Sequence, residues 1–417
     1  METRNELLVR HAEAMVDEAL ADTRVVTING ARQVGKSTLA RLVAANTDRA
    51  LLRFLDDPAT LRAAQDDPAG FVDHDGLLVI DEVQLSPALF RSIKLAVDSD
   101  PRPGRFLLTG SSQVLALRDL PDALPGRMEI IEMWPLAQGE IEGAADRFVD
   151  AAFTHGSKLR CESGLRRRDY LDRVVRGGFP EAVRRQPRRR PAFFDSYLST
   201  LVSRDVMQLS AIERLGELRK LLALLASRAG GLLVPGTLSG LSGISRSTLN
   251  RYLDLLSAAF LVKRIPAWAA GQTQRAISTP KLAFVDSGIA SHLLGQDSGR
   301  LAEPGGAAGP MVENFVLMEL ARQLTWSDQR AELYHYRTKD GTEVDAVLET
   351  PDGRVVAIEA KAAATVRTED LAGLRHLATR LGERFVAGFV LYSGQQTLPF
   401  GDRLRAMPIE SLWTVEP

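Results

Sequence analysis

Short apolar runs alternate with amphipathic stretches over roughly the first third of the chain. The runs at residues 25–28, 77–80 and 106–109 are rich in branched side chains, and each is long enough for one buried strand. Between them apolar residues recur at helical spacing, as at Leu39 and Val43. Strands that alternate with helices predict an α/β fold, a parallel sheet with helices on both faces.

The hydrophobic pattern then becomes mainly helical. Residues 192–228 are rich in Leu and Ala. A turn at residues 243–245 precedes a predicted helix at 246–260, and two strand-like stretches follow at 261–265 and 281–286. Helices followed by two strands in this order predict a winged helix.

The most specific motif lies directly after the first strand. Gly30 is followed by four residues and then by Gly35, Lys36 and Ser37, which is the spacing of a P-loop. Glycines let successive main-chain N–H groups cradle a phosphate, and the next helix adds the positive end of its dipole. Lys36 can reach the β- and γ-phosphates of ATP, and the Ser37 hydroxyl can hold Mg²⁺. The predicted nucleotide-binding residues are Gly30, Ala31, Arg32, Gln33, Val34, Gly35, Lys36, Ser37 and Thr38.

The second apolar run ends in two carboxylates, Asp81 and Glu82. This pattern is typical of a Walker B strand, in which Asp81 binds Mg²⁺ through water and Glu82 polarises the attacking water. Glu82 as a simple helix cap is the alternative. We expect the P-loop and this element to lie on adjacent strands.

The third run ends in the polar segment Gly110–Gln113. Hydroxyl groups at a strand tip resemble the sensor position of AAA-type ATPases, which detects the γ-phosphate, and Ser111 or Ser112 is the candidate. Arg127 could act as an arginine finger in its own subunit or in a neighbour. A plain surface arginine is an equal alternative.

The helix predicted at 246–260 is polar on one side. Leu249 and Leu253 are expected to face the core. The opposite side carries Arg246, Ser247, Asn250 and Arg251. These residues would enter the DNA major groove if the winged helix reads DNA, whereas a rigid protein-contact module is the alternative. The basic run at 184–190 is either a phosphate contact or a solvated surface.

Residues 343–361 predict a β-hairpin. Two stretches, 343–349 and 355–361, flank a turn at 351–353 that holds Pro, Asp and Gly. A three-residue loop with Gly353 in the left-handed conformation fixes the register of the two strands.

In that register Asp345 lies opposite Glu359, and Glu343 lies opposite Lys361. One face is then apolar, with Val344, Ala346, Leu348, Val356, Ile358 and Ala360. The other face gathers the four charged side chains.

This charged set resembles the Asp…Glu-x-Lys site of restriction-endonuclease-like nucleases. The resemblance implies that Asp345 and Glu359 hold Mg²⁺, that Lys361 orients or activates water, and that Glu313 is a further acidic ligand. An exposed hairpin with cross-strand ion pairs is one alternative. A nuclease-like fold that has lost its activity is another.

Composition narrows these possibilities. The chain has 417 residues and a net charge of −1, so nucleic-acid binding requires a local basic patch. A single cysteine, Cys161, excludes an internal disulfide framework and a cysteine-based zinc site. Neither a signal peptide nor a membrane span is evident, so we expect a cytoplasmic protein. Only eight of the 52 basic residues are lysines, which draws attention to Lys36 and Lys361.

Taken together, the chain resembles a family of uncharacterised prokaryotic AAA-type ATPases with a winged helix and a restriction-endonuclease-like C-terminal domain. The segments that carry the resemblance are residues 30–38, 79–84, 108–112, 176–181, 284–288, 312–314, 343–345 and 359–361. The resemblance implies four regions, a P-loop ATPase domain, a helical lid or linker, a winged helix and a nuclease-like domain. We place them at residues 1–142, 143–215, 216–300 and 301–417.

Three functions remain open at this point. The first is a Mg²⁺-dependent ATPase that acts on DNA or on a DNA-bound partner. The second is an ATP-gated, metal-dependent nuclease. The third is a nucleotide switch that binds protein partners without catalysis. ATP and Mg²⁺ are the expected cofactors in each case, and oligomerisation is possible.

Overall fold

The computed structural model describes residues 7–110, 124–202, 215–269 and 279–416. Its residues group into two compact units. The N-terminal unit comprises Met1–Leu136 together with Ala258–Phe260, and the C-terminal unit comprises Ala137–Ser257 and Leu261–Pro417. The division into four regions stays a prediction.

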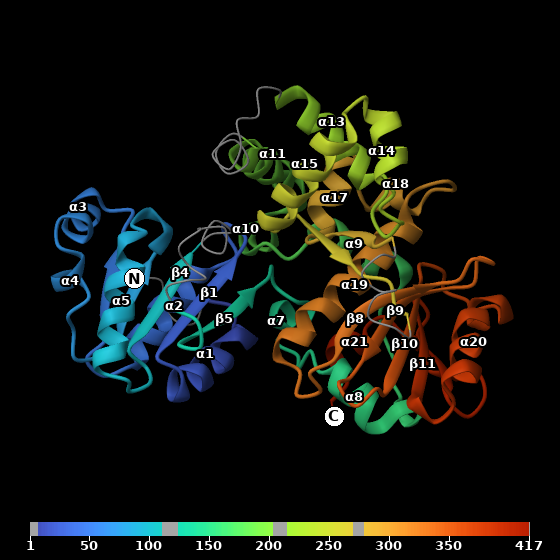
Figure 1. The fold of residues 1–417 in the computed structure, drawn as a ribbon. Helices are drawn as coiled ribbons and strands as arrows, with labels where there is room; N and C mark the ends of the chain where they lie inside the picture. Colours follow the sequence, from blue (N-terminus) through green and yellow to red (C-terminus); the bar gives the residue numbers. More distant parts are fainter. Residues whose placement is uncertain (1–6, 111–123, 203–214, 270–278, 417) are drawn as a thin grey trace. The chain divides into compact units, whose positions relative to one another are not determined.

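A five-stranded parallel sheet forms the centre of the N-terminal unit (Figure 1). Its strands, in spatial order, are β2 (Leu51–Phe54), β3 (Leu78–Asp81), β4 (Phe106–Gly110), β1 (Val25–Gly30) and β5 (Met128–Met133). Every residue of β1, β3 and β4 is buried, as their apolar runs predict.

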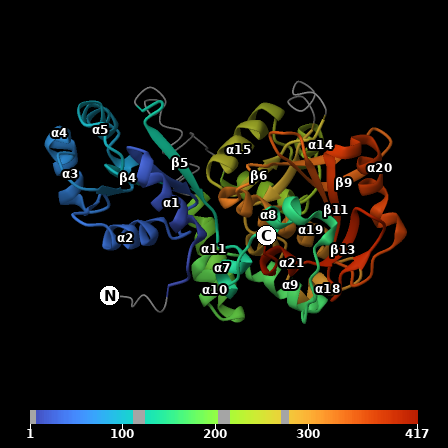
Figure 2. The ribbon, with the colours of Figure 1, turned by 90° about the horizontal axis from the view of Figure 1, so that it is seen from below.

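Helices cover both faces of this sheet (Figure 2). They are α1 (His11–Asp22), α2 (Lys36–Asn46), α3 (Pro58–Asp66), α4 (Pro68–Phe71) and α5 (Ala88–Ser99). One face of the sheet packs its apolar side chains against Phe90 and Ile93 of α5, whereas α2 contacts β1, β3 and β4. The predicted parallel α/β fold of a P-loop nucleotide hydrolase is therefore confirmed.

The order of the central strands corrects one expectation. Phe106 of β4 pairs with Val25 of β1 on one side and with Leu78 of β3 on the other. The P-loop strand and the Walker B strand are therefore not adjacent, because β4 lies between them. After β3 the chain passes through α5 and enters the middle of the sheet as β4. The hydrophobic pattern predicts that these strands exist but not their order in the sheet.

The C-terminal unit begins with helices and a small hairpin. The helices are α7 (Gln138–Glu142), α8 (Phe148–His155), α9 (Arg167–Arg176), α10 (Pro180–Arg184), α11 (Arg190–Thr200), α13 (Leu215–Ala226), α14 (Pro235–Ser242) and α15 (Arg246–Ala258). Antiparallel strands β6 (Val262–Ile265) and β7 (Lys281–Phe284) follow. The expected order of helices and strands is present, while a DNA-reading winged helix stays a prediction.

A mixed six-stranded sheet follows in the same unit. Its spatial order is β12 (Leu398–Pro399), β13 (Leu404–Pro408), β11 (Phe385–Tyr392), β10 (Val355–Lys361), β9 (Glu343–Glu349) and β8 (Glu332–Arg337). The remaining helices are α17 (Ser287–Leu293), α18 (Ser298–Ala302), α19 (Ala308–Trp326), α20 (Ala372–Leu381) and α21 (Ser411–Thr414). Figure 1 shows α19 and α20 on opposite sides of this sheet.

The hairpin has the predicted register where its two strands pair. Val355 pairs with Glu349 and Ile358 with Ala346, and Gly353 has a φ of +84° in the turn. Pairing of β9 with β10 ends at Ala346, however, so the expected pairings of Asp345 with Glu359 and of Glu343 with Lys361 are both wrong.

A register shift explains this difference. Tyr334 of β8 pairs with Val347, and Tyr336 pairs with Val344, so regular alternation breaks between the two pairs. As a result Val344 joins Val347 in one buried cluster under α20, instead of lying on the opposite face. The prediction of one apolar and one charged face is therefore wrong, since both faces carry buried side chains.

Within the ranges that the structure describes, we find no helix with the length and hydropathy that a membrane crossing requires.

Candidate functional site

The loop between β1 and α2 makes two demands that only glycine meets. A Cβ atom at Gly30 would lie 2.1 Å from the main-chain oxygen of Met133 on β5. Gly35 has a φ of +101°, in the left-handed region. The main chain therefore turns closely enough at both positions to direct its amides toward a ligand.

Lys36 begins α2, and its side chain folds back over this loop. The residue is 5% exposed, and its Nζ donates to the main-chain oxygens of Gly30 at 3.0 Å and Ala31 at 2.8 Å. These bonds hold the ammonium group beside the loop amides. A phosphate in this cradle would meet donors and a positive charge together.

Arg10 braces the same loop, a role that the sequence did not reveal. Its guanidinium donates to the main-chain oxygen of Val34 at 2.8 Å and to that of Trp134 at 2.7 Å. The loop is thereby fixed to the end of β5. Arg10 lies directly before an amphipathic helix, and no sequence motif marks it as a contact of the P-loop.

Thr109 joins the two carboxylate residues of the Walker B strand. Its hydroxyl donates to Asp81 Oδ1, and the main-chain N–H of Glu82 donates to Thr109 Oγ1 at 3.2 Å. Thr109 lies on β4, the strand between β1 and β3, so it can position both groups. The sequence predicted the sensor at Ser111 or Ser112, which lie outside the described residues. The hydroxyl group of Thr109, at the end of the same apolar run, was the signal that could have identified it.

Glu82 does not act as a helix cap, and its carboxylate is instead held by a neighbouring side chain. It precedes a single helical turn at Val83–Leu85, but its side chain makes no capping hydrogen bond. Its φ of +58° is unusual for a residue with a side chain, and Gln84 Nε2 donates to Glu82 Oε2. These contacts orient the carboxylate at the tip of β3.

Ser37 and Asp81 fit the donor set that Mg²⁺ prefers. Thr109 engages one oxygen of the buried Asp81 carboxylate, while the other has no hydrogen-bond partner among the described residues. Ser37 is half-buried in the first turn of α2, directly after Lys36. Hydroxyl and carboxylate oxygens are thus available for the ion.

Arg127 is engaged on the surface of its own unit. Its Nε pairs with Asp98 Oδ1 at 2.5 Å, and its Nη1 donates to the main-chain oxygen of Pro125 at 3.2 Å. Action as an arginine finger stays a prediction that would require this ion pair to open.

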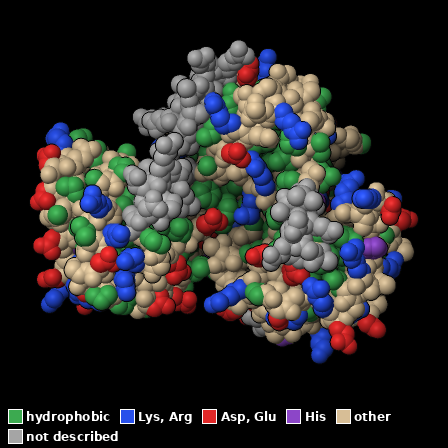
Figure 3. Space-filling view, in the orientation of Figure 1, with side chains coloured by type: hydrophobic (Ala, Val, Ile, Leu, Met, Phe, Trp, Pro, Cys, Tyr) green, Lys and Arg blue, Asp and Glu red, His purple; other side chains and the backbone are tan. Residues whose placement is uncertain are grey.

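The four polar residues predicted to read DNA are exposed on α15. They are Arg246, Ser247, Asn250 and Arg251. Leu249 and Leu253 on the same helix are buried, as the pattern predicts. On the face shown in Figure 3, basic and acidic side chains are interspersed, in line with the net charge of −1.

In the C-terminal unit, a lysine that sequence reasoning missed lies between two of the predicted carboxylates. Lys281 on β7 contacts Glu313 Oε1 at 2.5 Å and Asp345 Oδ1 at 2.9 Å, and its side chain is 5% exposed. Asp345 Oδ2 also accepts from the main-chain N–H of Ala360 at 3.0 Å. The scarcity of lysine was the available signal, but it drew attention to Lys361.

Glu359 and Lys361 form a second, neighbouring pair. Lys361 Nζ lies 2.9 Å from Glu359 Oε1 and 3.6 Å from Asp370 Oδ1. Glu343, which was expected in this group, instead pairs with Arg337 at 2.9 Å at the exposed end of the strand.

As arranged, these carboxylates do not form a ready metal site. No group of three or more His, Cys, Asp or Glu residues in the described ranges is placed to hold a metal ion. The ammonium group of Lys281 takes the position between Glu313 and Asp345 that a cation would need. These residues therefore do not fit a bound metal ion in this arrangement, and a nuclease role for them stays a prediction.

Glu313 and Glu359 of this cluster have pKa values well above the ordinary range of a glutamate. Burial, followed by the charge of Asp345, raises the pKa of Glu313 to about 8 and that of Glu359 to about 7. The two lysines oppose this effect only in part. A proton is thus retained on the cluster near neutral pH.

Comparison with protein families agrees with the N-terminal geometry. Residues 22–142 match the model of an AAA domain. The chain carries an AAA-type P-loop ATPase domain. Residues 167–300 and 308–412 match two domains of unknown function, DUF8612 and DUF4143.

Curated relatives span most of the chain. Uncharacterized proteins of Mycobacterium bovis and Mycobacterium tuberculosis are each 28% identical over 408 residues, which cover 97% of this chain and 84% of theirs. An uncharacterized protein of Haemophilus influenzae is 23% identical over 253 residues, which cover 59% of this chain and 57% of that protein.

Two solved structures are similar to parts of this chain. The Walker-type ATPase of Pyrococcus abyssi has a TM-score of 0.41 at 14% identity, over 70% of this chain and 97% of that one. AMPPCP-bound DnaA from Aquifex aeolicus has a TM-score of 0.32 at 14% identity, over 61% and 90% of the two chains.

The buried carboxyl groups predict how stability depends on pH. Above pH 4.5 the unfolded chain releases protons that Glu313 and Glu359 keep in the folded state, so the free energy of unfolding should fall as pH rises toward 8. Glu313→Gln, which fixes the neutral form, should reduce this slope by up to about 1.4 kcal/mol per pH unit. Urea unfolding between pH 5 and 8 measures it. The exposed Glu383 gives the control Glu383→Gln, and equal slopes for the two variants would contradict the assignment.

Proposed function

We propose that this protein is a Mg²⁺-dependent ATPase that acts on DNA or on a DNA-bound partner. The observation that carries the proposal is the loop of glycines around Lys36, set beside the Asp81–Thr109 contact. These features supply a phosphate cradle after β1 and a carboxylate held at the tip of β3 by a hydroxyl group of the intervening strand β4.

Each residue has a defined role in this proposal. The amides of residues 30–38 and the Lys36 ammonium bind the phosphates of ATP and stabilise the charge that develops on transfer. Ser37 and Asp81 would hold Mg²⁺, which would supply further positive charge against the phosphates. Glu82 accepts hydrogen bonds from the attacking water and orients it. Thr109 keeps Asp81 and Glu82 at a fixed separation.

The DNA part of the proposal rests on α15. Its exposed Arg246 and Arg251 have no hydrogen-bond or ion-pair partner among the described residues, so both guanidinium groups are free to contact phosphates or base edges. They lie on the helix that precedes the β6–β7 hairpin, where a winged helix carries its recognition residues.

The alternative of an ATP-gated nuclease has weaker support. Asp345, Glu359 and Lys361 do gather on neighbouring strands, but Lys281 already neutralises the Asp345 carboxylate. A non-catalytic switch would not need a carboxylate to orient water, so the position of Glu82 does not favour this alternative.

Replacement of Lys36 tests the ATPase directly. Lys36→Ala removes the ammonium group beside the phosphate cradle, so we expect ATP turnover at saturating Mg²⁺ to fall by about 100-fold or more. Lys94→Ala, at the other lysine of residues 1–142, should leave turnover within about twofold. Phosphate release measures both rates. Equal rates for Lys36→Ala and wild type would refute the proposal.

Thr109 provides a more specific test of how the carboxylates are held. Thr109→Val keeps the shape of the side chain but removes the hydroxyl that contacts Asp81 and Glu82. We expect kcat to fall by about tenfold, whereas Thr109→Ser should retain most of the activity. If valine and serine gave the same kcat, Thr109 would have no positioning role.

DNA binding is tested on α15. The double variant Arg246→Ala/Arg251→Ala should weaken binding to a fluorescent duplex by about tenfold or more at fixed salt. Arg219→Ala, at an exposed arginine of α13, serves as the control for a general loss of charge. If the duplex binds the wild type, the double variant and the control equally well, or binds none of them, the DNA part of the proposal is wrong. The ATPase part does not depend on this result.

A further inference from the structure

Two glycine-containing segments that have no role in the proposed ATPase meet inside the C-terminal unit. They are residues 176–181 and 284–288. The main-chain N–H of Gly178 donates to Asp286 Oδ2 at 2.7 Å, and a Cβ atom at Gly177 would lie 2.3 Å from Asp286 Oδ1. Asp286 is buried and also caps α17, so the two segments form one rigid junction.

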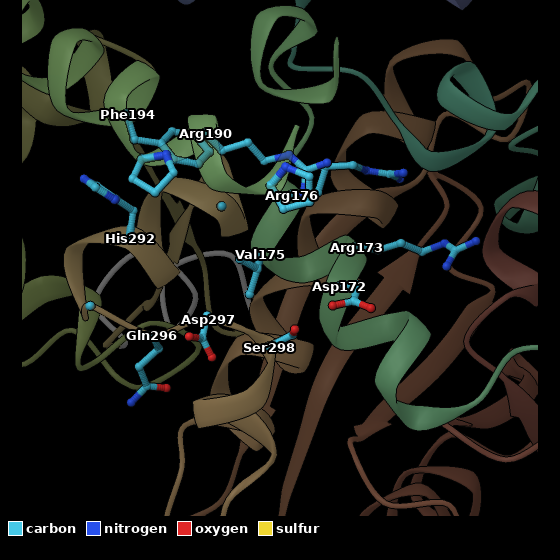
Figure 4. A pocket seen from close by; sticks show the side chains of 14 residues that line it. Asp172, Arg173, Val175, Arg176, Arg190, Phe194, His292, Gln296, Asp297 and Ser298 are labelled. Carbon is cyan, nitrogen blue, oxygen red and sulfur yellow. The ribbon is translucent and has the colours of Figure 1, made fainter. Parts of the chain in front are cut away.

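A cavity of about 630 Å³ lies beside this junction. Its walls come from α9, from residues 187–194, from α17 and from the loop that leads into α18. Figure 4 shows Arg190 and Phe194 on one side, Gln296 and Asp297 on the other, and Val175 between them. This volume suits a ligand of mononucleotide size.

Positive charge gathers at one part of the wall. Arg190 Nε donates to the main-chain oxygens of Ala182 at 3.0 Å and Arg185 at 3.1 Å, while its terminal nitrogens have no partner among the described residues. Burial, reinforced by the charge of Arg173, lowers the pKa of Arg176. Arg176 Nη2 donates to Gln138 Oε1 at 2.6 Å and lies 3.9 Å from Glu142 Oε1, so an anion at this position would chiefly engage Arg176 Nε and the terminal nitrogens of Arg190.

Two buried polar atoms of the cavity residues lack hydrogen-bond partners within the described part of the chain. They are Arg176 Nε, a donor, and Gln296 Oε1, an acceptor. Orphaned polar atoms are costly in a folded protein unless a ligand or water satisfies them. A ligand with an oxyanion and a separate N–H or O–H group would satisfy both.

The remaining charged groups of the wall are already engaged or lie at its edge. Asp297 Oδ1 accepts from the main-chain N–H of Arg300 at 2.9 Å, and His292 pairs with Asp195 at 2.9 Å. Asp172 is exposed and would attract hydroxyl or amino groups of a ligand. The wall therefore offers a basic part and a part rich in acceptors.

We propose that this cavity binds a small organic phosphate of mononucleotide size. Its phosphate contacts Arg176 and Arg190, and its hydroxyl or amino groups donate to Gln296. The site belongs to the C-terminal unit and does not depend on the proposed ATPase function.

Adenosine monophosphate is the probe for this proposal, and adenosine is its uncharged counterpart. Binding is measured by calorimetry on the full chain with Lys36→Ala, so that the P-loop does not contribute. We expect saturable binding of the monophosphate below about 1 mM, and binding of adenosine at least about tenfold weaker.

Three variants in the same background locate the site. Arg190→Ala should weaken binding by about tenfold, and Gln296→Ala, whose side chain holds no other described contact, by about threefold or more. The exposed neighbour Arg189 gives the control Arg189→Ala, which should bind within about twofold of the parent. The proposal is overturned if the monophosphate does not bind, if adenosine binds as tightly, or if Gln296→Ala and Arg190→Ala both bind as the parent does.

Discussion

The shape of the P-loop depends on a close approach between two main-chain segments, at Gly30 of β1 and Met133 of β5. The Met133 oxygen leaves room only for a hydrogen atom on Gly30, and Gly35 adopts a conformation that side chains disfavour. This turn lets α2 begin at Lys36, whose ammonium group folds back onto the main-chain oxygens of Gly30 and Ala31. The proposed chemistry depends on this loop together with the contact between Asp81 and Thr109 at the tips of β3 and β4.

Buried charge organises the C-terminal unit in a comparable way. Lys281 contacts both Glu313 and Asp345, and Asp286 accepts main-chain N–H groups from two separate segments. Unpaired charges would be too costly in these positions, so each contact fixes the elements that carry it. The Asp345 cluster is thereby held by a lysine, whereas Arg190, whose terminal nitrogens have no partner among the described residues, lines the cavity beside Arg176.

Local information in the sequence predicted a large part of this structure. The spacing of residues 30–38 is sufficient for the P-loop, and the turn at Gly353 fixes the hairpin register, because both depend on neighbouring residues. Strand order, the partners of Thr109 and the position of Lys281 depend on contacts between distant segments. A single sequence contains no direct record of such contacts, which is why β4 was misplaced and Lys281 was missed.

The central claim is that the loop ahead of Lys36 binds the polyphosphate of ATP. Calorimetric titration of the full-length protein with ATP at millimolar Mg²⁺ tests it most directly. We predict one binding event per chain with a dissociation constant of about 1–100 μM, absent or greatly weakened in Lys36→Ala. A folded protein that takes up no ATP, or that binds it equally well without Lys36, would contradict this account.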